Sequence, residues 1–252
     1  ADASRSAPDR GLDGLLKAQR YLEEQLNSSP GLATDPELIR DLVEYYWQTG
    51  LIYTQIQADY QDASDALKAK ATADKAAAEW EKAEVAAKRL DTPLIEHGTE
   101  QGEAWKNLTR LARAFAELQI DKGQAVMESL SGRFSTTIEA LVQQKMQEIK
   151  DDSLNRLIRD ADTASGQSSP VKLLQAATRY SLAKQLDFEV RYEAVITSGL
   201  KELGERIEPV LTARCAEAMS NAISVGWTSR ANFTPHSPKT SRIGFQSCAK
   251  RT

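Results

Sequence analysis

Apolar residues recur along this chain at intervals of three and four positions, which predicts helices rather than strands. The longest such pattern covers residues 35–90. Asp35 is a favourable N-cap and Pro36 suits the first helical position. Beyond Leu67 the pattern becomes rich in alanine, whose side chains each bury little area. We predict one continuous helix here. Its 56 residues, at a rise of 1.5 Å each, would give a rod of roughly 85 Å.

An aromatic column lies within this predicted helix. Tyr46, Tyr53 and Tyr60 are spaced seven apart and therefore share one face. The apolar stripe around them is broad, so we predict that the column packs in the core. Trp47 lies beside that stripe and is the better candidate for an exposed contact. The alternative is a binding stripe for a partner, formed by the three tyrosines with Trp47 and Trp105, because tyrosine and tryptophan supply rigid contact area.

Two further long helices are predicted by the same spacing. The second covers residues 103–164, with a bend near Gly123 or Gly132. The third covers residues 171–224 and contains Pro209, which should kink it. A segment rich in serine, glycine and proline separates the two, and no stretch alternates as a strand would.

These patterns predict an all-α protein, namely an elongated antiparallel three-helix bundle, coiled-coil-like, with a short N-terminal helix and an irregular C-terminal tail. Residues 1–225 are expected to form one bundle and residues 226–252 an extended basic tail. The tail carries five basic and no acidic residues, so residues 1–225 carry a charge of -9, which is the total of -4 minus +5. Cys215 and Cys248 would pin the tail if they form a disulfide.

Several sequence features favour an extracytoplasmic location, whether secreted, periplasmic or at the cell surface. The chain begins Ala1-Asp2-Ala3, as expected of a processed export precursor or a shortened chain. Three of its five asparagines, Asn27, Asn107 and Asn232, lie in glycosylation acceptor patterns. Chance matches are the alternative for these sequons. No apolar run approaches the ~20 residues that a membrane-spanning helix needs. The chain is therefore expected to be a glycoprotein with one disulfide.

Catalytic and metal-binding motifs are not recognisable in the sequence. The two histidines, His97 and His236, lack the histidine four residues away that a zincin motif needs. A segment at residues 160–166 resembles a calcium loop, but Ala164 stands where a ligand oxygen is required. Nucleophile elbows and glycine-rich phosphate loops are also missing. We therefore expect no enzyme activity, no metal and no cofactor. The acidic charge of residues 1–225 argues against nucleic acid as a partner.

The expected function is that of a non-enzymatic, exported binding or surface protein that presents its helical bundle to a protein partner. In outline the three long helices resemble those of trypanosome surface receptors and coat proteins, which implies an extracellular binding role. One alternative is a structural or assembly subunit of a secretion or virion-type machine, so oligomer formation stays open. Another is a membrane-shaping module, because three long helices are also similar in outline to BAR domains. Membrane contact is not favoured, since such domains need clustered Lys and Arg.

Overall fold

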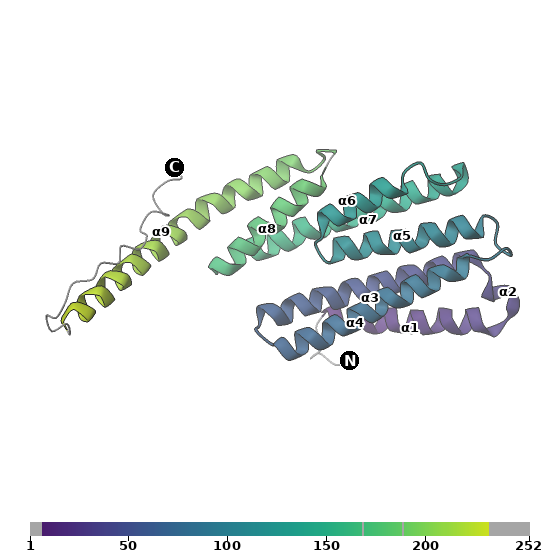
Figure 1. The fold of residues 1–252 in the computed structure, drawn as a ribbon, viewed down its shortest axis with the longest axis horizontal. Coiled ribbons are helices and arrows are strands. Elements are labelled where there is room, and N and C mark those ends of the chain that lie inside the picture. Colours follow the sequence, from purple (N-terminus) through teal and green to yellow (C-terminus); the bar gives the residue numbers. More distant parts are fainter. Residues whose placement is uncertain (1–6, 168, 188, 232–252) are drawn as a thin grey trace, which may run out of the picture. The chain divides into compact units, whose positions relative to one another are not determined.

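The computed structural model describes residues 7–167, 169–187 and 189–231, and these residues are almost entirely helical (Figure 1). Nine α-helices and one short 3-10 helix account for this described part of the chain, which contains no strand. The predicted all-α class is therefore confirmed. The chain divides into two compact units, residues 1–203 and residues 204–252.

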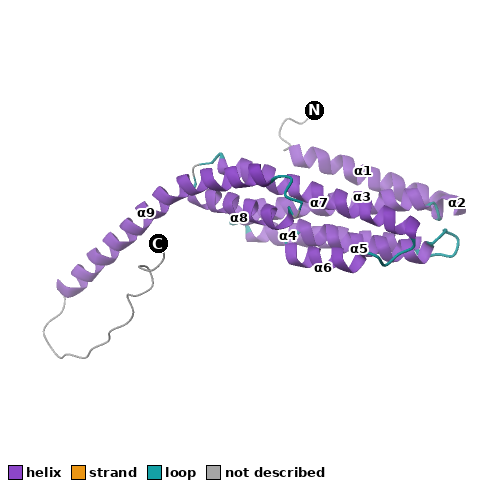
Figure 2. Cartoon of the chain, turned by 90° about the horizontal axis from the view of Figure 1, so that it is seen from above, coloured by secondary structure: helices purple, strands orange, loops and turns teal. Residues whose placement is uncertain are grey.

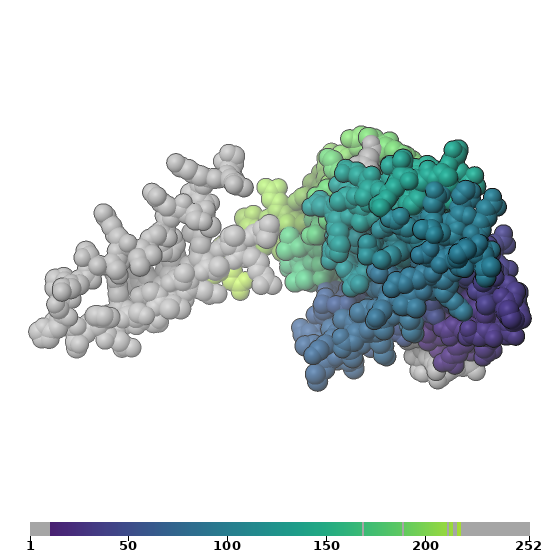
Figure 3. Space-filling model, turned by 45° about the vertical axis from the view of Figure 1, so that its right-hand side comes forward, coloured from purple at the N-terminus to yellow at the C-terminus, as the bar shows by residue number. Residues whose placement is uncertain are grey.

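The helices of the first unit are joined by short connections, drawn in teal in Figure 2. In order they are α1 (Ala7–Ser28), α2 (Pro30–Ala33), α3 (Pro36–Asp62), α4 (Ala66–Ala87), η1 (Lys88–Leu90), α5 (Gly98–Ala116), α6 (Ile120–Leu130), α7 (Thr136–Ser165) and α8 (Pro170–Leu186). The last helix, α9 (Glu193–Ala231), begins in the first unit and continues into the second. In the space-filling view of Figure 3, the blue to teal side chains of α4 to α7 lie against one another.

The predicted single helix over residues 35–90 is wrong, because the chain reverses in its middle. Between α3 and α4, Ser64 adopts a left-handed backbone conformation with φ of 58°. Asp65 then caps α4, where its carboxylate accepts a hydrogen bond from the backbone N–H of Lys68. The alanine-rich half of the predicted rod thus packs side by side with its aromatic half (Figure 1).

The other two predicted rods are divided in the same way, so the three-helix bundle is not confirmed. Leu118 and Gly132 have φ of 60° and 70° and separate α5, α6 and α7. Val190, with φ of 57°, lies between α8 and α9. The predicted bend at Gly132 is a complete turn, whereas Gly123 lies inside α6. A Cβ on Gly123 would stand 2.1 Å from the ring of Phe115, so this glycine permits close packing of α6 on α5.

The predicted tail is only partly described. Because α9 extends to Ala231, residues 226–231 are helical rather than extended. Pro209 lies within the same helix. The rest of the tail lies outside the described residues, and so does Cys248, which leaves the disulfide with Cys215 and the domain boundary at residue 225 as predictions.

Backbone strain at Ser64 can be tested by substitution. Ser64→Gly is expected to raise the free energy of unfolding by up to about 1 kcal/mol, because glycine adopts positive φ without the steric penalty of a Cβ. The converse change, Gly132→Ala, should lower it by about 1 kcal/mol. An added Cβ there would meet no atom within 4 Å, so only the backbone conformation is affected. Urea unfolding followed by circular dichroism measures both free energies of unfolding. A loss for Ser64→Gly or a gain for Gly132→Ala would contradict the positive φ at these turns.

Candidate functional site

The tyrosine column of α3 is covered by three lysines of α4 that have the same seven-residue spacing. Each Nζ lies 5.5 to 5.7 Å from a ring centroid, in the pairs Tyr46–Lys82, Tyr53–Lys75 and Tyr60–Lys68. Such cation–π pairs contribute about 0.5–1 kcal/mol at exposed sites. The sequence pattern drew attention to the tyrosines alone, although the lysine spacing was equally visible. The column therefore stabilises the α3–α4 pair and is not a free binding stripe.

The three tyrosines differ in their burial. Tyr46 lies in the core, as predicted, and its hydroxyl donates to Glu23 of α1. Burial, together with this hydrogen bond, raises the pKa of Tyr46 above its ordinary value. Tyr53 and Tyr60 are half-buried. Only one member of the column is thus a full core residue.

Trp47 and Trp105 are both inside the protein. Their rings stack with centroids 5.3 Å apart and an interplanar angle of 26°. Trp47 is 8% exposed and Trp105 is 1% exposed, so the expectation of an exposed Trp47 is wrong. The reason is that α3 packs against α1, α4 and α5 at once, which leaves few of its faces open.

The indole of Trp47 is held by one side-chain hydrogen bond. Its Nε1 donates to Oγ1 of Thr109 over 2.9 Å, and that hydroxyl donates to the carbonyl of Trp105 over 2.8 Å. Thr109 is itself 1% exposed. The pair of tryptophans and this threonine therefore form one buried unit that joins α3 to α5.

Thr109→Val is expected to lower the free energy of unfolding by about 1–3 kcal/mol, because the buried N–H of Trp47 would lose its acceptor. Thr163→Val is the matched control. Thr163 is exposed, and its hydroxyl donates only to the carbonyl of Arg159 in its own helix, so its loss should cost less than about 0.5 kcal/mol. Equal losses in guanidinium unfolding would show that the Trp47–Thr109 bond does not contribute to stability.

Two of the predicted glycosylation sites are described, and they differ in exposure: Asn27 is exposed, whereas Asn107 is half-buried. Asn27 is exposed near the end of α1, where its Oδ1 accepts from Arg89 over 3.3 Å. Asn107 lies within α5, and its Nδ2 donates to the carbonyl of Glu103 over 3.0 Å. Its acceptor threonine, Thr109, is buried. Asn232 lies outside the described residues. In the folded chain Asn27 is therefore the better of the two described acceptors.

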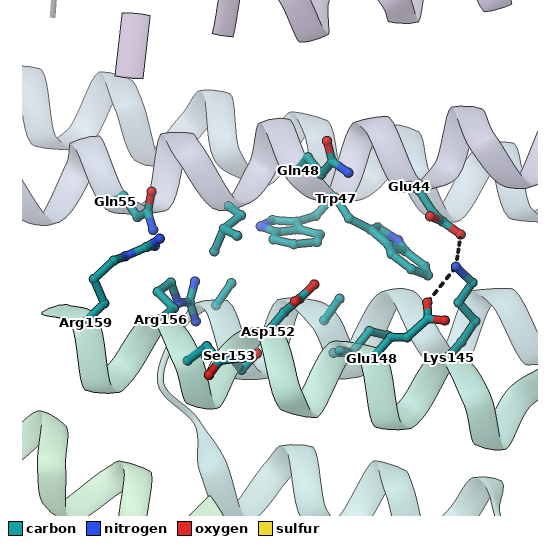
Figure 4. Close-up of a pocket in the computed structure, with 16 residues that line it drawn as sticks. Glu44, Trp47, Gln48, Gln55, Lys145, Glu148, Asp152, Ser153, Arg156 and Arg159 are labelled. Carbon is teal, nitrogen blue, oxygen red and sulfur yellow. Dashed lines mark ion pairs between the residues drawn. The ribbon is translucent and has the colours of Figure 1, made fainter. Parts of the chain in front are cut away.

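A cavity of about 410 Å³ lies beside Trp47, between α3, α4, α5 and α7 (Figure 4). Small-molecule sites typically have ~300–1,000 Å³. Its apolar lining residues are Trp47, Leu51, Trp80, Ala112, Ala116 and Ile149. Its polar and charged lining residues are Glu44, Gln48, Gln55, Lys145, Glu148, Asp152, Ser153, Asn155, Arg156 and Arg159. The cavity thus combines two tryptophan rings with a lining that is more polar than that of a typical small-molecule site.

Trp80 is positioned by a glycine of the opposite helix. A Cβ on Gly50 would lie 2.8 Å from the Trp80 ring, so glycine is what lets this ring, 2% exposed, lie flat against α3. Its Nε1 is buried and has no hydrogen-bond partner among the described residues. A ligand in the cavity would therefore meet the ring of Trp80 rather than its N–H.

Arg156 places a guanidinium in the interior. The residue is 7% exposed, and its Nη2 donates to the carbonyl of Phe115 over 2.8 Å, at the end of α5. Burial lowers the pKa of Arg156 to about 10. Within the described chain no acidic side chain forms an ion pair with Arg156 or with Arg159, which is exposed at the same end of the cavity. Only one of the five N–H donors of Arg156 is occupied by that carbonyl.

The opposite end of the cavity is closed by an ion-pair network. Lys145 of α7 contacts Glu44 of α3 and Glu148 of α7, each over 2.8 Å, as the dashed lines in Figure 4 show. Burial alone would lower the pKa of Lys145, but the hydrogen bonds to Glu148 and Glu44 raise it overall. This lysine is therefore neutralised by protein groups, unlike the two arginines.

The described residues meet neither the requirement for a clustered metal site nor that for a membrane-spanning helix. They hold no group of three or more His, Cys, Asp or Glu side chains that could bind a metal ion. Among the described helices, none is long and apolar enough to cross a membrane. His97 precedes α5 and lies 3.8 Å from carboxylate oxygens of Glu96 and Glu100, and His236 lies outside the described residues.

Comparison with protein families, with curated proteins and with solved structures finds no match for this chain. The function of the candidate site is therefore inferred from its geometry alone.

Proposed function

We propose that this chain is a non-enzymatic binding protein that holds a small-molecule ligand in the cavity between α3, α4, α5 and α7. The observation that carries the proposal is the position of the two arginines. Arg156 and Arg159 line a cavity of about 410 Å³ beside an aromatic surface, and neither has an acidic partner in the described part of the chain. Arginines that line a pocket without an ion-pair partner favour a ligand, because most of their N–H donors stay available to it.

A protein-facing aromatic stripe is less well supported than a ligand cavity. Tyr46, Trp47 and Trp105, which the sequence suggested for such a stripe, are buried, and Tyr53 and Tyr60 lie under lysines. The rigid contact area that tryptophan supplies is thus turned inward, where Trp47 lines the cavity. An exported location and a glycan at Asn27 stay part of the proposal.

Binding without catalysis is supported by the chemistry of the lining. Ser153 provides a hydroxyl, but no histidine or cysteine of the described chain lines the cavity. A serine nucleophile needs an adjacent base to be activated. Asp152 is exposed, and the carboxylates of Glu44 and Glu148 are engaged by Lys145. This arrangement suits ligand binding better than acid–base chemistry.

Filling the cavity tests this function. A chemically mixed library of organic acids, amides and amines is screened for compounds that raise the melting temperature and change tryptophan fluorescence. Ala112→Leu adds bulk at a lining position and should abolish binding of the compounds found. Ala140→Leu, an exposed position of α7 away from the cavity, is the control and should leave binding unchanged. Absence of any bound compound, or binding unaffected by Ala112→Leu, would overturn the proposal.

A further inference from the structure

The charges that line the cavity are segregated along α7. Three are positive and three negative, so their sum is zero. Lys145 and Glu148, with Glu44 from α3, form the closed network at one end. Two arginines occupy the other end, and Asp152 lies between the two ends (Figure 4). With Asp152 counted at the arginine end, that end carries +1 and the lysine end -1.

Arg156 and Arg159 are three residues apart on α7, which places them on one helix face. Figure 4 shows both at the end of the cavity where Gln55 projects from α3. Two arginines and a glutamine therefore line this end of the cavity. The positive charge of Arg159 repels that of Arg156, and an anion between the two would relieve that repulsion.

Burial of Arg156 strengthens the argument for an anion. Asp160 and Asp152 act on Arg156 through longer-range charge attraction, but neither forms an ion pair with it, and a buried charge without a direct counter-ion is costly to the folded protein. Its contact with the carbonyl of Phe115 uses one donor, and that carbonyl also accepts from the N–H of Leu118 over 3.3 Å. The carbonyl of Phe115, at the end of α5, would therefore stay hydrogen-bonded without Arg156. Guanidinium matches a carboxylate in two parallel hydrogen bonds, which a neutral ligand cannot reproduce.

We infer that the ligand is a small organic anion, whose carboxylate binds between Arg156 and Arg159 and whose apolar part packs against Trp47 and Trp80. This inference rests on the proposed function, because it assigns the ligand class of the same cavity. At the lysine end of the cavity the carboxylates of Glu44 and Glu148 outnumber Lys145, so this end disfavours an anion and would contact the uncharged part of the ligand.

Three probes of similar size and different charge test the ligand class: phenylacetate, phenylacetamide and phenethylamine. Each is titrated into the full chain at low salt and followed by the indole N–H signals in nuclear magnetic resonance spectra. Phenylacetate is expected to bind about tenfold or more tightly than phenylacetamide, as a charge-assisted hydrogen bond predicts. Added salt should reduce that preference.

Variants assign the preference to the arginines. Arg156→Met and Arg159→Gln should each remove most of the tenfold preference for phenylacetate. Arg133→Gln is the matched control, because it removes the same charge from a residue that pairs with Glu103 and does not line the cavity. It should leave the preference for phenylacetate unchanged. Arg159 is exposed, so its variant keeps the test valid even if Arg156→Met fails to fold.

The outcomes separate the two proposals. If neutral or cationic compounds bind in a manner that Ala112→Leu abolishes, and phenylacetate shows no preference, the anion inference is wrong and the binding function stands. A preference that persists in both arginine variants also overturns the inference. If no compound of the wider library binds, the proposed function itself fails.

Discussion

Trp105→Ala is expected to lower the free energy of unfolding by about 3–5 kcal/mol. Trp105 is 1% exposed and stacks on Trp47, so its removal leaves a large cavity between α3 and α5. Loss of the stacking partner would also loosen Trp47 and the lining of the ligand cavity. Because domains are typically stable by about 5–15 kcal/mol, this single change would remove a large share of the total.

Denaturant unfolding of Trp105→Ala is compared with two other variants. Trp105→Phe keeps an aromatic ring in place and should cost less. Tyr21→Ala removes a ring that is 61% exposed and should change stability by less than about 0.5 kcal/mol. If Trp105→Ala costs no more than Tyr21→Ala, then Trp105 is not a core residue, and the aromatic binding stripe again becomes the better interpretation.

The helical class was predictable because the spacing of apolar residues reports it directly, but the turns were not. Ser64, Leu118 and Val190 reverse or redirect the chain with positive φ, although none is a glycine. Leucine and valine are not turn residues, and a serine is a weaker turn signal than glycine, proline, asparagine or aspartate. Of the turns with positive φ named here, only the one at Gly132 was anticipated, as a bend near Gly123 or Gly132, and glycine adopts this conformation at little cost. Helix length was therefore overestimated wherever a non-glycine residue makes the turn.

The missed reversal at Ser64 explains the error at Trp47. A straight rod would have left Trp47 outside its apolar seam, whereas the folded-back α4 and the adjacent α5 enclose it. Arg156 was missed for a different reason, since charged residues at helical spacing are usually solvated. Its burial depends on the end of α5, where it contacts the carbonyl of Phe115, and the sequence pattern had continued that helix past Ala116 to residue 164.

Arg156→Met is expected to raise the free energy of unfolding by about 1–4 kcal/mol while it abolishes anion binding. Replacing a buried ion pair with apolar side chains of similar volume is often neutral or stabilising by about 1–4 kcal/mol, and we extend this to Arg156, which is buried without an ion-pair partner. Phe115 keeps a second donor, the N–H of Leu118, so the end of α5 stays hydrogen-bonded. Stability and function would thus change in opposite directions, as expected of a residue retained for binding.

The dependence on pH gives this prediction a second measurement. Because burial lowers the pKa of Arg156 from its ordinary value to about 10, the folded state releases this proton at a lower pH than the unfolded state does, and the unfolded state binds more protons in the interval that begins near pH 10. Wild-type stability should therefore rise with pH in that interval, and the advantage of Arg156→Met should shrink there. At neutral pH Arg156 is charged in both the folded and the unfolded state, so the full difference in stability between Arg156→Met and wild type is present. A variant that is less stable than wild type at neutral pH, and that binds phenylacetate normally, would identify Arg156 as a structural cap of α5.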